Sequence, residues 1–506
     1  MKVEKSLPII LLVIVFRRGP AHFDTAEDWP MWRYDPGHTS CSPEELAKEL
    51  NLQWVLELPV PKSCWPFTQF RMLFDLSYEP IVMGNRLFVP SMVRDSVTAY
   101  DTETGEKQWC FYADGPVRFA PVGWNGKIYF ISDDSHLYCL DAEKGTLLWK
   151  FRGGPSDYKV LGNERLISMW PARGGPVLYD GTIYFAASIW PFMGTFIHAL
   201  DAETGQVVWT NGGSGSDFIL QPHASPAFAG VGPQGYLAAT EDKLLVASGR
   251  SVPAVYDRQT GKFLYFQTVT KNGSCEILVG KDWFVNEEIM YNLDDGERFA
   301  NSNASIVSGD TMIGIDEEGR IRASLLDPVW TEYVDRRGEK QKRPEFPTLW
   351  ETQQPIKEIF IRAGSRLYCG APGLVAAVNI PSASGEPSSI SWQSRIEGNP
   401  WSMLAANGRL FVVTKEGRIY CFGERQTRTR IYKLETQALE APRVSNDSVS
   451  SAQGILEKTG VREGYCLVLG LENGQLLEGL LRNSNLHIIG LDSDADRVES
   501  LRRKFD

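Results

Sequence analysis

Residues that commonly build metal and redox sites are scarce in this sequence. It has six His, and none of them stand at a spacing typical of metal ligation. Its eight Cys include no adjacent pair and no C-x-x-C motif, so the sequence supports neither a zinc site nor a redox motif. Cys139, Cys369 and Cys421 follow Leu-Tyr or Ile-Tyr, which indicates a small buried apolar residue at one repeated strand position. We assign no metal ligand and no catalytic residue.

Positive charge is also in short supply. Lys and Arg number 52 against 63 Asp and Glu, and the formal net charge is −11. A nucleic-acid-binding surface needs an excess of positive charge to displace counterions from phosphates. The composition therefore argues against a nucleic-acid partner.

Long apolar runs are missing as well. The run at residues 7–16 is too short to cross a bilayer as a helix, and we expect no transmembrane span. A run of this length near the N-terminus suits the core of a signal peptide. We expect residues 1–22 to be signal-peptide-like and the protein to be periplasmic or secreted; a cytoplasmic protein with an uncleaved N-terminus is the alternative.

A repeated motif is what the sequence does contain. Three segments align without gaps, and a fourth has Tyr where the others end in Trp. The Asp of the motif recurs at steps of 40, 60 and 56 residues. Since one blade of a β-propeller takes about 40–45 residues, the longer steps indicate inserted loops. The four copies are residues 99–109, 139–149, 199–209 and 255–265.

The motif has the chemistry of a β-hairpin. Its Asp carboxylate can accept hydrogen bonds from backbone N–H groups across the turn, and the Gly four residues later supplies a positive φ. The Trp then falls on a fixed face of the next strand, where a large indole can fill the wedge between neighbouring blades. Another strand pair precedes each motif, which makes about four strands per unit, as a propeller blade requires.

The pattern A-x-D-x-x-T-G-x-x-x-W resembles the repeat of pyrroloquinoline-quinone (PQQ)-binding propellers and of their non-enzymatic relatives. The latter include BamB-like propeller subunits of the outer-membrane barrel-assembly machinery. The opening Asp28-Trp-Pro-Met-Trp-Arg-Tyr34 is similar to a segment common in that family. The resemblance implies an all-β fold, and we predict a PQQ-like β-propeller over residues 23–423.

Weaker copies bring the expected count to eight blades. Residues 289–296 and 311–319 keep the strand, the turn and the Gly but lose the Trp, and two later hairpins complete the series. We expect residues 52–58 to complete the final blade, because this closure removes open sheet edges.

The resemblance does not by itself predict quinone binding. In PQQ-dependent dehydrogenases a central funnel holds the quinone on a calcium ion, with an Asp as general base and a vicinal disulfide packed on the ring. This sequence has no adjacent Cys pair, and no acidic cluster in it matches that site residue by residue. The Asp residues of the repeats suit turn caps better than catalytic bases. We expect no cofactor, and a PQQ-dependent dehydrogenase is the less favoured function.

A binding scaffold is the favoured function. A propeller presents loops on two faces, where a protein or peptide can dock. Aromatic-rich insertions at residues 64–70, 169–171 and 189–192 either line one of these faces or pack the longer loops. We expect a monomer that docks a partner on one face.

The composition changes after Gly423. Residues 424–450 are polar and charged, and we expect a linker there. An α/β pattern follows. Its expected helices and strands are a helix at 452–460, a strand at 465–470, a helix at 475–482, a strand at 487–491 and a helix at 495–504.

This order resembles the first half of a class I S-adenosylmethionine-dependent methyltransferase. In that family the turn after the first strand approaches the cofactor, and an acid after the second strand binds its ribose hydroxyls. The matching residues are Gly470, Gly474 and Asp492, although the family usually has an acid at the position of Gly470. We expect residues 451–506 to be a partial, Rossmann-like segment that binds S-adenosylmethionine only if further strands complete it. The alternatives are the N-terminal part of a propeller–methyltransferase fusion and an ordinary βαβα tail.

Overall fold

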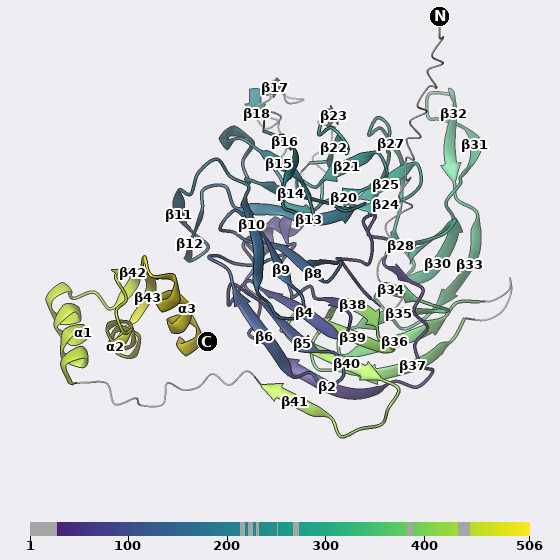
Figure 1. Ribbon diagram of the computed structural model, residues 1–506. Helices are drawn as coiled ribbons and strands as arrows, with labels where there is room; N and C mark the ends of the chain where they lie inside the picture. Colours follow the sequence, from purple (N-terminus) through teal and green to yellow (C-terminus); the bar gives the residue numbers. More distant parts are fainter. Residues whose placement is uncertain are drawn as a thin grey trace, which may run out of the picture.

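A computed structural model describes residues 28–212, 218–220, 226–228, 232–249, 251–266, 273–381, 388–433 and 446–505. The predicted signal-peptide-like segment, residues 1–22, lies outside the described residues. Eight sheets of four or five strands surround one axis, and a small α/β unit lies beside this ring (Figure 1). The predicted eight-bladed propeller is confirmed.

Blades 1 to 4 follow one another along the chain as antiparallel sheets. Blade 1 is β3 (Ile81–Met83), β4 (Arg86–Ser91), β5 (Ser96–Asp101) and β6 (Lys107–Tyr112). Blade 2 is β7 (Val122–Trp124), β8 (Lys127–Ile131), β9 (His136–Asp141) and β10 (Leu147–Arg152). Blade 3 is β13 (Ala172–Tyr179), β14 (Thr182–Ala187), β15 (Phe196–Asp201) and β16 (Val207–Asn211). Blade 4 is β20 (Ala238–Ala239), β21 (Lys243–Val246), β22 (Ala254–Asp257) and β23 (Phe263–Tyr265).

Blades 5 to 7 continue the same strand order. Blade 5 is β24 (Leu278–Val279), β25 (Trp283–Asn286), β26 (Ile289–Asn292) and β27 (Arg298–Asn301). Blade 6 is β28 (Ala304–Ser308), β29 (Thr311–Ile315), β30 (Arg320–Leu325) and β33 (Thr348–Gln353). Blade 7 is β34 (Glu358–Ala363), β35 (Arg366–Ala371), β36 (Leu374–Asn379) and β37 (Ile390–Arg395).

Blade 8 closes the ring with a strand from near the N-terminus. Its sheet joins β38 (Pro400–Ala406), β39 (Arg409–Thr414) and β40 (Arg418–Gly423) to β2 (Asn51–Glu57). The predicted closure of the last blade by residues 52–58 is therefore confirmed, one residue earlier along the chain. β41 (Arg430–Lys433) adds a fifth strand, parallel to β2. Part of the segment predicted as a linker, residues 424–450, thus belongs to the outer edge of the propeller.

Insertions between the strands decorate the ring. Two short strands, β1 (Cys41–Ser42) and β19 (Gly235–Tyr236), extend the inner edges of blades 7 and 3 in parallel. The remaining strands form three separate hairpins. These are β11 (Lys159–Gly162) with β12 (Arg165–Ser168), β17 (Phe218–Leu220) with β18 (Pro226–Phe228), and β31 (Val329–Val334) with β32 (Lys340–Glu345).

The repeated Asp caps its turn, as predicted. The Asp101 carboxylate accepts hydrogen bonds from the backbone N–H groups of Glu103 and Thr104 at 3.0 and 2.8 Å. Asp141 accepts the equivalent pair of bonds in blade 2. These bonds satisfy turn N–H groups that have no strand partner.

The repeated Trp lies on the turn Gly of the next blade. A Cβ on Gly261, for example, would stand 2.4 Å from the indole of Trp209. Trp209 also donates a hydrogen bond to the carbonyl oxygen of Arg258 at 3.0 Å, so this indole joins blades 3 and 4. The Gly is needed for this close approach as well as for its positive φ. The same seat holds Trp54 on Gly105, Trp109 on Gly145 and Trp149 on Gly205.

The sixth blade keeps the Trp that the sequence pattern fails to show. Trp350 on β33 lies opposite Ala323, as Trp109 lies opposite Ala99 in blade 1. The hairpin β31–β32 separates the third and fourth strands, so the Trp falls far from its expected position in the sequence.

The prediction that the repeat cysteines share one strand position was partly wrong, because Cys369 lies on the second strand of its blade and Cys139 on the third. All three repeat cysteines are buried, and no Cys forms a disulfide.

The C-terminal unit has the predicted order of elements. It contains α1 (Asn446–Thr459), β42 (Glu463–Leu469), α2 (Gln475–Asn483), β43 (Asn485–Leu491) and α3 (Ala495–Phe505). The two strands are parallel. No helix among the described residues has the length and apolar character needed to span a membrane.

Candidate binding site

Residues 28–40, which we call the opening segment, line the axis of the ring. Trp29 exchanges two backbone hydrogen bonds with Val82 of blade 1, both at 2.9 Å. The Trp32 indole stacks on Tyr236 with ring centroids 3.9 Å apart, and His38 Nδ1 lies 2.8 Å from the carbonyl oxygen of Ile277. These contacts fix a segment of irregular backbone against blades 1, 3 and 5.

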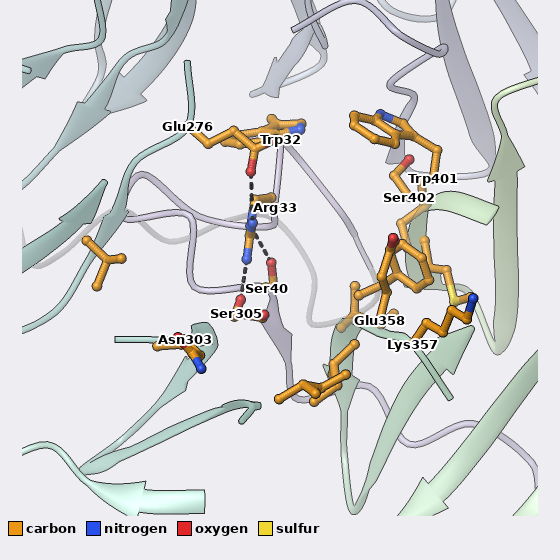
Figure 2. Close-up of a pocket in the computed structure, with 18 of the residues that line it drawn as sticks. Trp32, Arg33, Ser40, Glu276, Asn303, Ser305, Lys357, Glu358, Trp401 and Ser402 are labelled. Carbon is orange, nitrogen blue, oxygen red and sulfur yellow. Dashed lines mark hydrogen bonds and ion pairs between the residues drawn. The ribbon is translucent and has the colours of Figure 1, made fainter. Parts of the chain in front are cut away.

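A cavity of about 640 Å³ remains beside this segment (Figure 2). Its walls come from the opening segment, from the residues before β3 and β24, and from the inner strands of blades 6, 7 and 8. Six acidic and two basic residues line it. The acidic residues are Glu79, Glu276, Glu288, Asp316, Glu317 and Glu358, and the basic residues are Arg33 and Lys357.

Arg33 is held by its neighbours and leaves most of this negative charge uncompensated. Its Nε donates to the Ser40 hydroxyl at 2.7 Å, and its Nη2 donates to the carbonyl oxygen of Ser305. Its Nη1 lies 3.7 Å from the Glu276 carboxylate (Figure 2). Burial lowers the pKa of Arg33, although Glu276 opposes this shift.

Three of the cavity carboxyls, those of Glu79, Glu276 and Glu358, hold their protons more tightly than free carboxyls do. Burial raises the pKa of Glu79 to about 8, and its Oε1 accepts a hydrogen bond from Trp401 Nε1 at 2.8 Å. Burial also raises the pKa of Glu276 and of Glu358. The negative charge of Glu276 adds to the effect of burial on the pKa of Glu79 and of Glu358.

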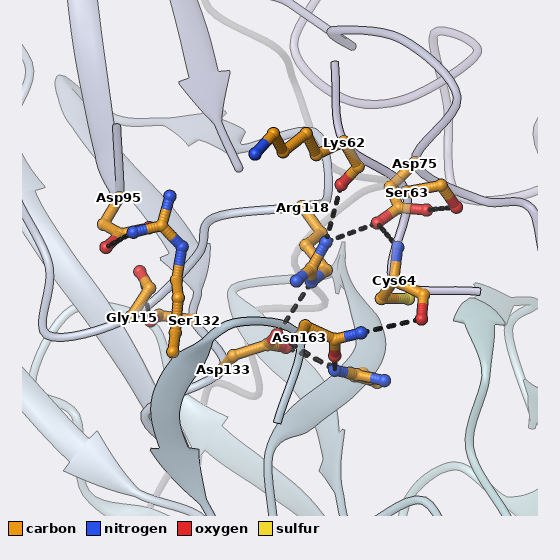
Figure 3. A network of polar contacts seen from close by, with 12 residues as sticks. Lys62, Ser63, Cys64, Asp75, Asp95, Gly115, Arg118, Ser132, Asp133 and Asn163 are labelled. Atoms are coloured by element: carbon orange, nitrogen blue, oxygen red, sulfur yellow. Dashed lines mark hydrogen bonds and ion pairs between the residues drawn. The ribbon is translucent and has the colours of Figure 1, made fainter. Parts of the chain in front are cut away.

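A different charged cluster lies on the side of blades 2 and 3 (Figure 3). Arg118 Nη1 contacts the Asp75 carboxylate at 2.6 Å and its Nε contacts Asp133 at 2.7 Å, while Arg173 Nη2 contacts Asp133 at 3.0 Å. Burial alone would raise the pKa of Asp133, but the two guanidinium groups lower it overall. We call these four residues the arginine brace. Its members are buried and mutually satisfied, so it joins loops to blades rather than presenting a site.

The predicted aromatic insertions gather on one face of the ring. Trp65 and Trp190 meet edge to face with centroids 6.2 Å apart, and Trp190 stacks on Phe192. Phe67, Phe70 and Phe192 are 80%, 60% and 58% exposed. We call these five residues the aromatic face. Both readings of the insertions hold in part, because Cys64 is buried under the loop and Trp170 donates to the carbonyl oxygen of Met193.

The cavity opens on the same side of the ring as the aromatic face. Neighbouring strands of a blade are antiparallel, so connections between blades emerge on the same side as those between second and third strands. Trp65 and Glu79 lie between β2 and β3, and Trp190 lies between the second and third strands of blade 3. Glu288 lies in the equivalent connection of blade 5.

Comparison with known proteins gives the fold a family. The family described as outer membrane protein assembly factor BamB matches residues 31–189 and 193–464. The chain belongs to this BamB family. The match includes strands of all eight blades and extends through α1 to the start of β42.

Individual relatives of this BamB-family chain are partial matches. The dehydrogenase subunit of a quinone alcohol dehydrogenase from Gluconacetobacter polyoxogenes is 32% identical over 126 residues, 22% of this chain and 16% of that protein. The serine/threonine-protein kinase AfsK of Streptomyces griseus is 29% identical over 221 residues, 39% of this chain and 25% of the kinase. The matches thus span a quarter or less of the length of both relatives.

The chain is also similar to solved structures at low identity. BamB from Moraxella catarrhalis is 17% identical with a TM-score of 0.34, covering 67% of this chain and 82% of that one. The quinohemoprotein alcohol dehydrogenase ADHIIG of Pseudomonas putida HK5 is 12% identical with a TM-score of 0.49, covering 85% and 86%.

The residues along the axis of this BamB-family propeller do not fit the quinone of its dehydrogenase relatives. PQQ is an anionic carboxylate, whereas the cavity carries a clear excess of acidic side chains. Trp32 and Arg33 of the opening segment occupy part of the axis and are held there by their own contacts. Among the described residues, no three acidic, His or Cys side chains group closely enough to hold a metal ion. We derive no chemistry from a quinone here.

The three residues predicted to contact S-adenosylmethionine come together in the C-terminal unit. Gly470 and Gly474 both have positive φ and flank the turn from β42 to α2. The Asp492 carboxylate accepts a hydrogen bond from the Leu471 backbone N–H at 2.7 Å and pairs with Arg497 at 2.8 Å. These contacts, with a bond from the Asp494 N–H, lower the pKa of Asp492 to about 2. The carboxylate therefore already closes the turn of its own chain.

The sequence interpretation missed the cavity acids, although a signal for them exists. Three of them come just before, or begin, the first strand of a blade. The segments are Glu79-Pro-Ile-Val, Glu276-Ile-Leu-Val and Glu358-Ile-Phe-Ile. Aligning the blades on their first strands, rather than on the Asp-Gly-Trp motif, makes this recurrence visible.

Proposed function

We propose that this propeller is a binding scaffold that docks a partner protein or peptide on its aromatic face. The observation that carries the proposal is the cluster of exposed Trp and Phe side chains on loops that a rigid ring holds in place. Aromatic residues dominate the energetics of protein interfaces, and exposed apolar patches of this kind mark interaction sites. The description of the family as an assembly factor supports the same role.

The remaining features of the proposal follow from the sequence. The scaffold acts as a monomer, outside the cytoplasm and without a cofactor. Its partner presents an apolar segment to the aromatic face, because side chains such as Phe67 gain most from contact with apolar surface.

A photo-crosslinking amino acid at position 192 tests the proposal in extracts of the source organism without added quinone. We expect one discrete adduct from position 192 and none from position 330, where Trp330 on β31 is similarly exposed. The adduct from position 192 should disappear when Phe67→Ser is added. Equal adducts from both positions contradict the proposal, as does quinone-dependent dye reduction by the purified chain.

A second candidate function is the N-terminal part of a propeller–methyltransferase fusion. It is favoured only by the placement of Gly470, Gly474 and Asp492 around one turn. Isothermal titration with S-adenosylmethionine tests it on the whole chain. Because the segment is expected to bind the cofactor only when further strands complete it, we expect no binding by this chain. Saturable binding that Asp492→Ala abolishes and Asp496→Ala preserves contradicts that expectation and shows that the segment binds the cofactor by itself.

A further inference from the structure

We propose that the acidic cavity on the propeller axis binds an organic cation, through an alkylammonium or guanidinium group. The proposal concerns a site separate from the aromatic face and does not depend on the docking function. It rests on the charge of the cavity, its aromatic walls, its size and one buried acid.

The cations of the chain balance only part of the charge of the cavity. Lys357 is in the lining, Lys415 acts on Glu358 without an ion pair, and Asp316 is paired with Arg320 and Arg322. Arg33 is shared among Ser40, Ser305 and Glu276. The carboxylates of Glu79, Glu288 and Glu358 form no ion pair with another described residue. Carboxylates that face one another across a partly enclosed space repel, and a ligand of opposite charge relieves that repulsion.

The walls between these acids are aromatic, and two of them already accept cations from the chain. The Lys415 ammonium lies 4.7 Å from the centre of the Trp401 ring, and the Arg33 guanidinium lies 5.5 Å from the centre of the Trp32 ring. Phe360 adds a third aromatic side chain to the lining. Aromatic faces combined with carboxylates are the surroundings in which proteins hold ammonium and guanidinium groups.

The geometry favours an organic cation over a metal ion. A metal ion needs several oxygen ligands within about 2.6 Å of one point. No three acidic side chains among the described residues converge in that way. The acids are spread instead over a cavity of about 640 Å³, which lies within the size range of small-molecule sites.

Glu79 is the independent sign that a cation belongs here. The residue is only 6% exposed, and its carboxylate interacts with two neutral side chains: it accepts a hydrogen bond from the indole N–H of Trp401 and is stabilised by the hydroxyl of Ser402. A buried carboxyl without a cationic partner is costly to ionise, whereas a bound cation allows it to ionise without that cost. Glu79 therefore favours binding of a cationic ligand and disfavours binding of an anionic one.

Two sources can supply such a group. It can belong to a free amine or guanidine compound, or to a Lys or Arg side chain of a docked polypeptide, because the cavity opens on the same side as the aromatic face. The recognition chemistry is the same, so the probes must include both.

The test is isothermal titration of the whole chain at pH 8 and low salt with agmatine, with spermidine and with a blocked Gly-Arg-Gly peptide. We expect saturable binding of at least one of them, and no binding of citrate. Glu358→Gln should weaken that binding by about tenfold or more, since losing a hydrogen bond to a charged group costs at least the roughly 1.4 kcal/mol that corresponds to a factor of ten. Glu358→Lys should abolish it by placing an ammonium group of the chain in the cavity.

The matched control is Glu332→Gln on the exposed hairpin β31–β32, which removes one carboxylate far from the cavity lining and should leave the affinity unchanged. Near-ultraviolet circular dichroism of each variant confirms that the ring is intact. Binding of agmatine or spermidine assigns the site to a free cation, and binding of the peptide alone assigns it to a docked side chain. Absence of saturable binding for all three cations overturns the proposal, as does equal affinity in wild type and Glu358→Gln.

Discussion

The two halves of the ring treat buried charge in opposite ways. On the side of blades 2 and 3, the arginine brace pairs Asp75 and Asp133 with guanidinium groups in direct contact. On the side of blades 5 to 8, Glu79 and Glu358 line a cavity and form no salt bridge with a described residue, and Arg33 and Lys415 act on them only from a distance. One fold therefore contains a satisfied charged core and an unsatisfied one.

The difference follows the regularity of the repeats. Blades 1 to 4 carry the complete motif, and each Trp or Tyr fills the wedge beside the following blade. Blade 5 has Ala300 where its neighbours have an aromatic residue, and blade 6 admits a hairpin before its Trp. We infer that the regular half supplies rigidity, whereas the irregular half was free to open a cavity and to collect charge.

The sharpest test of this comparison removes one arginine from each half. Arg118→Met leaves Asp75 and Asp133 buried with fewer partners, and we expect a loss of about 3–5 kcal/mol in the free energy of unfolding. Arg33→Met faces an open cavity, and we expect a loss below about 1 kcal/mol. Guanidinium-induced unfolding measures both. Equal losses contradict the distinction between a satisfied and an unsatisfied half.

The next test uses pH, because Glu79 and Asp133 shift in opposite directions. Burial raises the pKa of Glu79 from 4.5 to about 8, so the folded state binds a proton that the unfolded state releases between these values. Stability should therefore fall as pH rises from 5 to 8, by on the order of 3 kcal/mol relative to Glu79→Gln. The groups that face Glu79 are Arg33, Glu276, Trp401 and Ser402.

The counterpart on the regular side is Asp133→Asn. The lowered pKa of Asp133 means that its contribution is present above an unfolded pKa of about 3.8 and is lost as pH falls below that value. Unfolding curves between pH 3 and 9 separate the two variants. If the difference in the free energy of unfolding between wild type and Glu79→Gln stays constant from pH 5 to 8, the pKa of Glu79 is not raised.

Much of the fold was predictable from the sequence, for a local reason. The Asp cap, the Gly turn and the Trp all lie within eleven residues. Each copy of the motif, such as residues 99–109, therefore predicts its hairpin from local sequence alone. Closure by β2 was also predictable, because an unpaired edge needs a partner. Trp350 was missed since the hairpin β31–β32 breaks that local spacing.

The candidate site was much less predictable. Glu79, Glu276 and Glu358 lie in three different blades, and only closure of the ring brings them to one cavity. The brace joins Arg118 to Asp75 across 43 residues of chain. The placement of Gly470, Gly474 and Asp492 around one turn followed the pattern, but the contact of Asp492 with Arg497 shows that position alone does not assign a ligand.

A smaller effect is expected at two turn glycines, Gly261 in the regular half of the ring and Gly309 in the irregular half. Gly261 and Gly309 both have positive φ, so Ala at either position costs about 1 kcal/mol in backbone strain. Only Gly261 has an indole against it, and we expect Gly261→Ala to lose about a further 1–2 kcal/mol. Gly309 has nothing within 4 Å and is the matched control. Thermal unfolding of both variants measures the extra loss, and identical midpoints contradict the indole seat.

The smallest effect concerns two aromatic side chains that lie in different places and are both more than half exposed. Phe67→Ser on the aromatic face and Trp330→Ser on the hairpin of blade 6 should each change the free energy of unfolding by less than about 0.5 kcal/mol, because both side chains are mainly in water. Guanidinium unfolding checks this, and crosslinking from position 192 then separates them. Loss of the adduct in Phe67→Ser at unchanged stability assigns the aromatic face to binding. A large loss of stability in Phe67→Ser instead shows that the side chain stabilises the loop. Loss of the adduct is then no evidence that the aromatic face binds a partner.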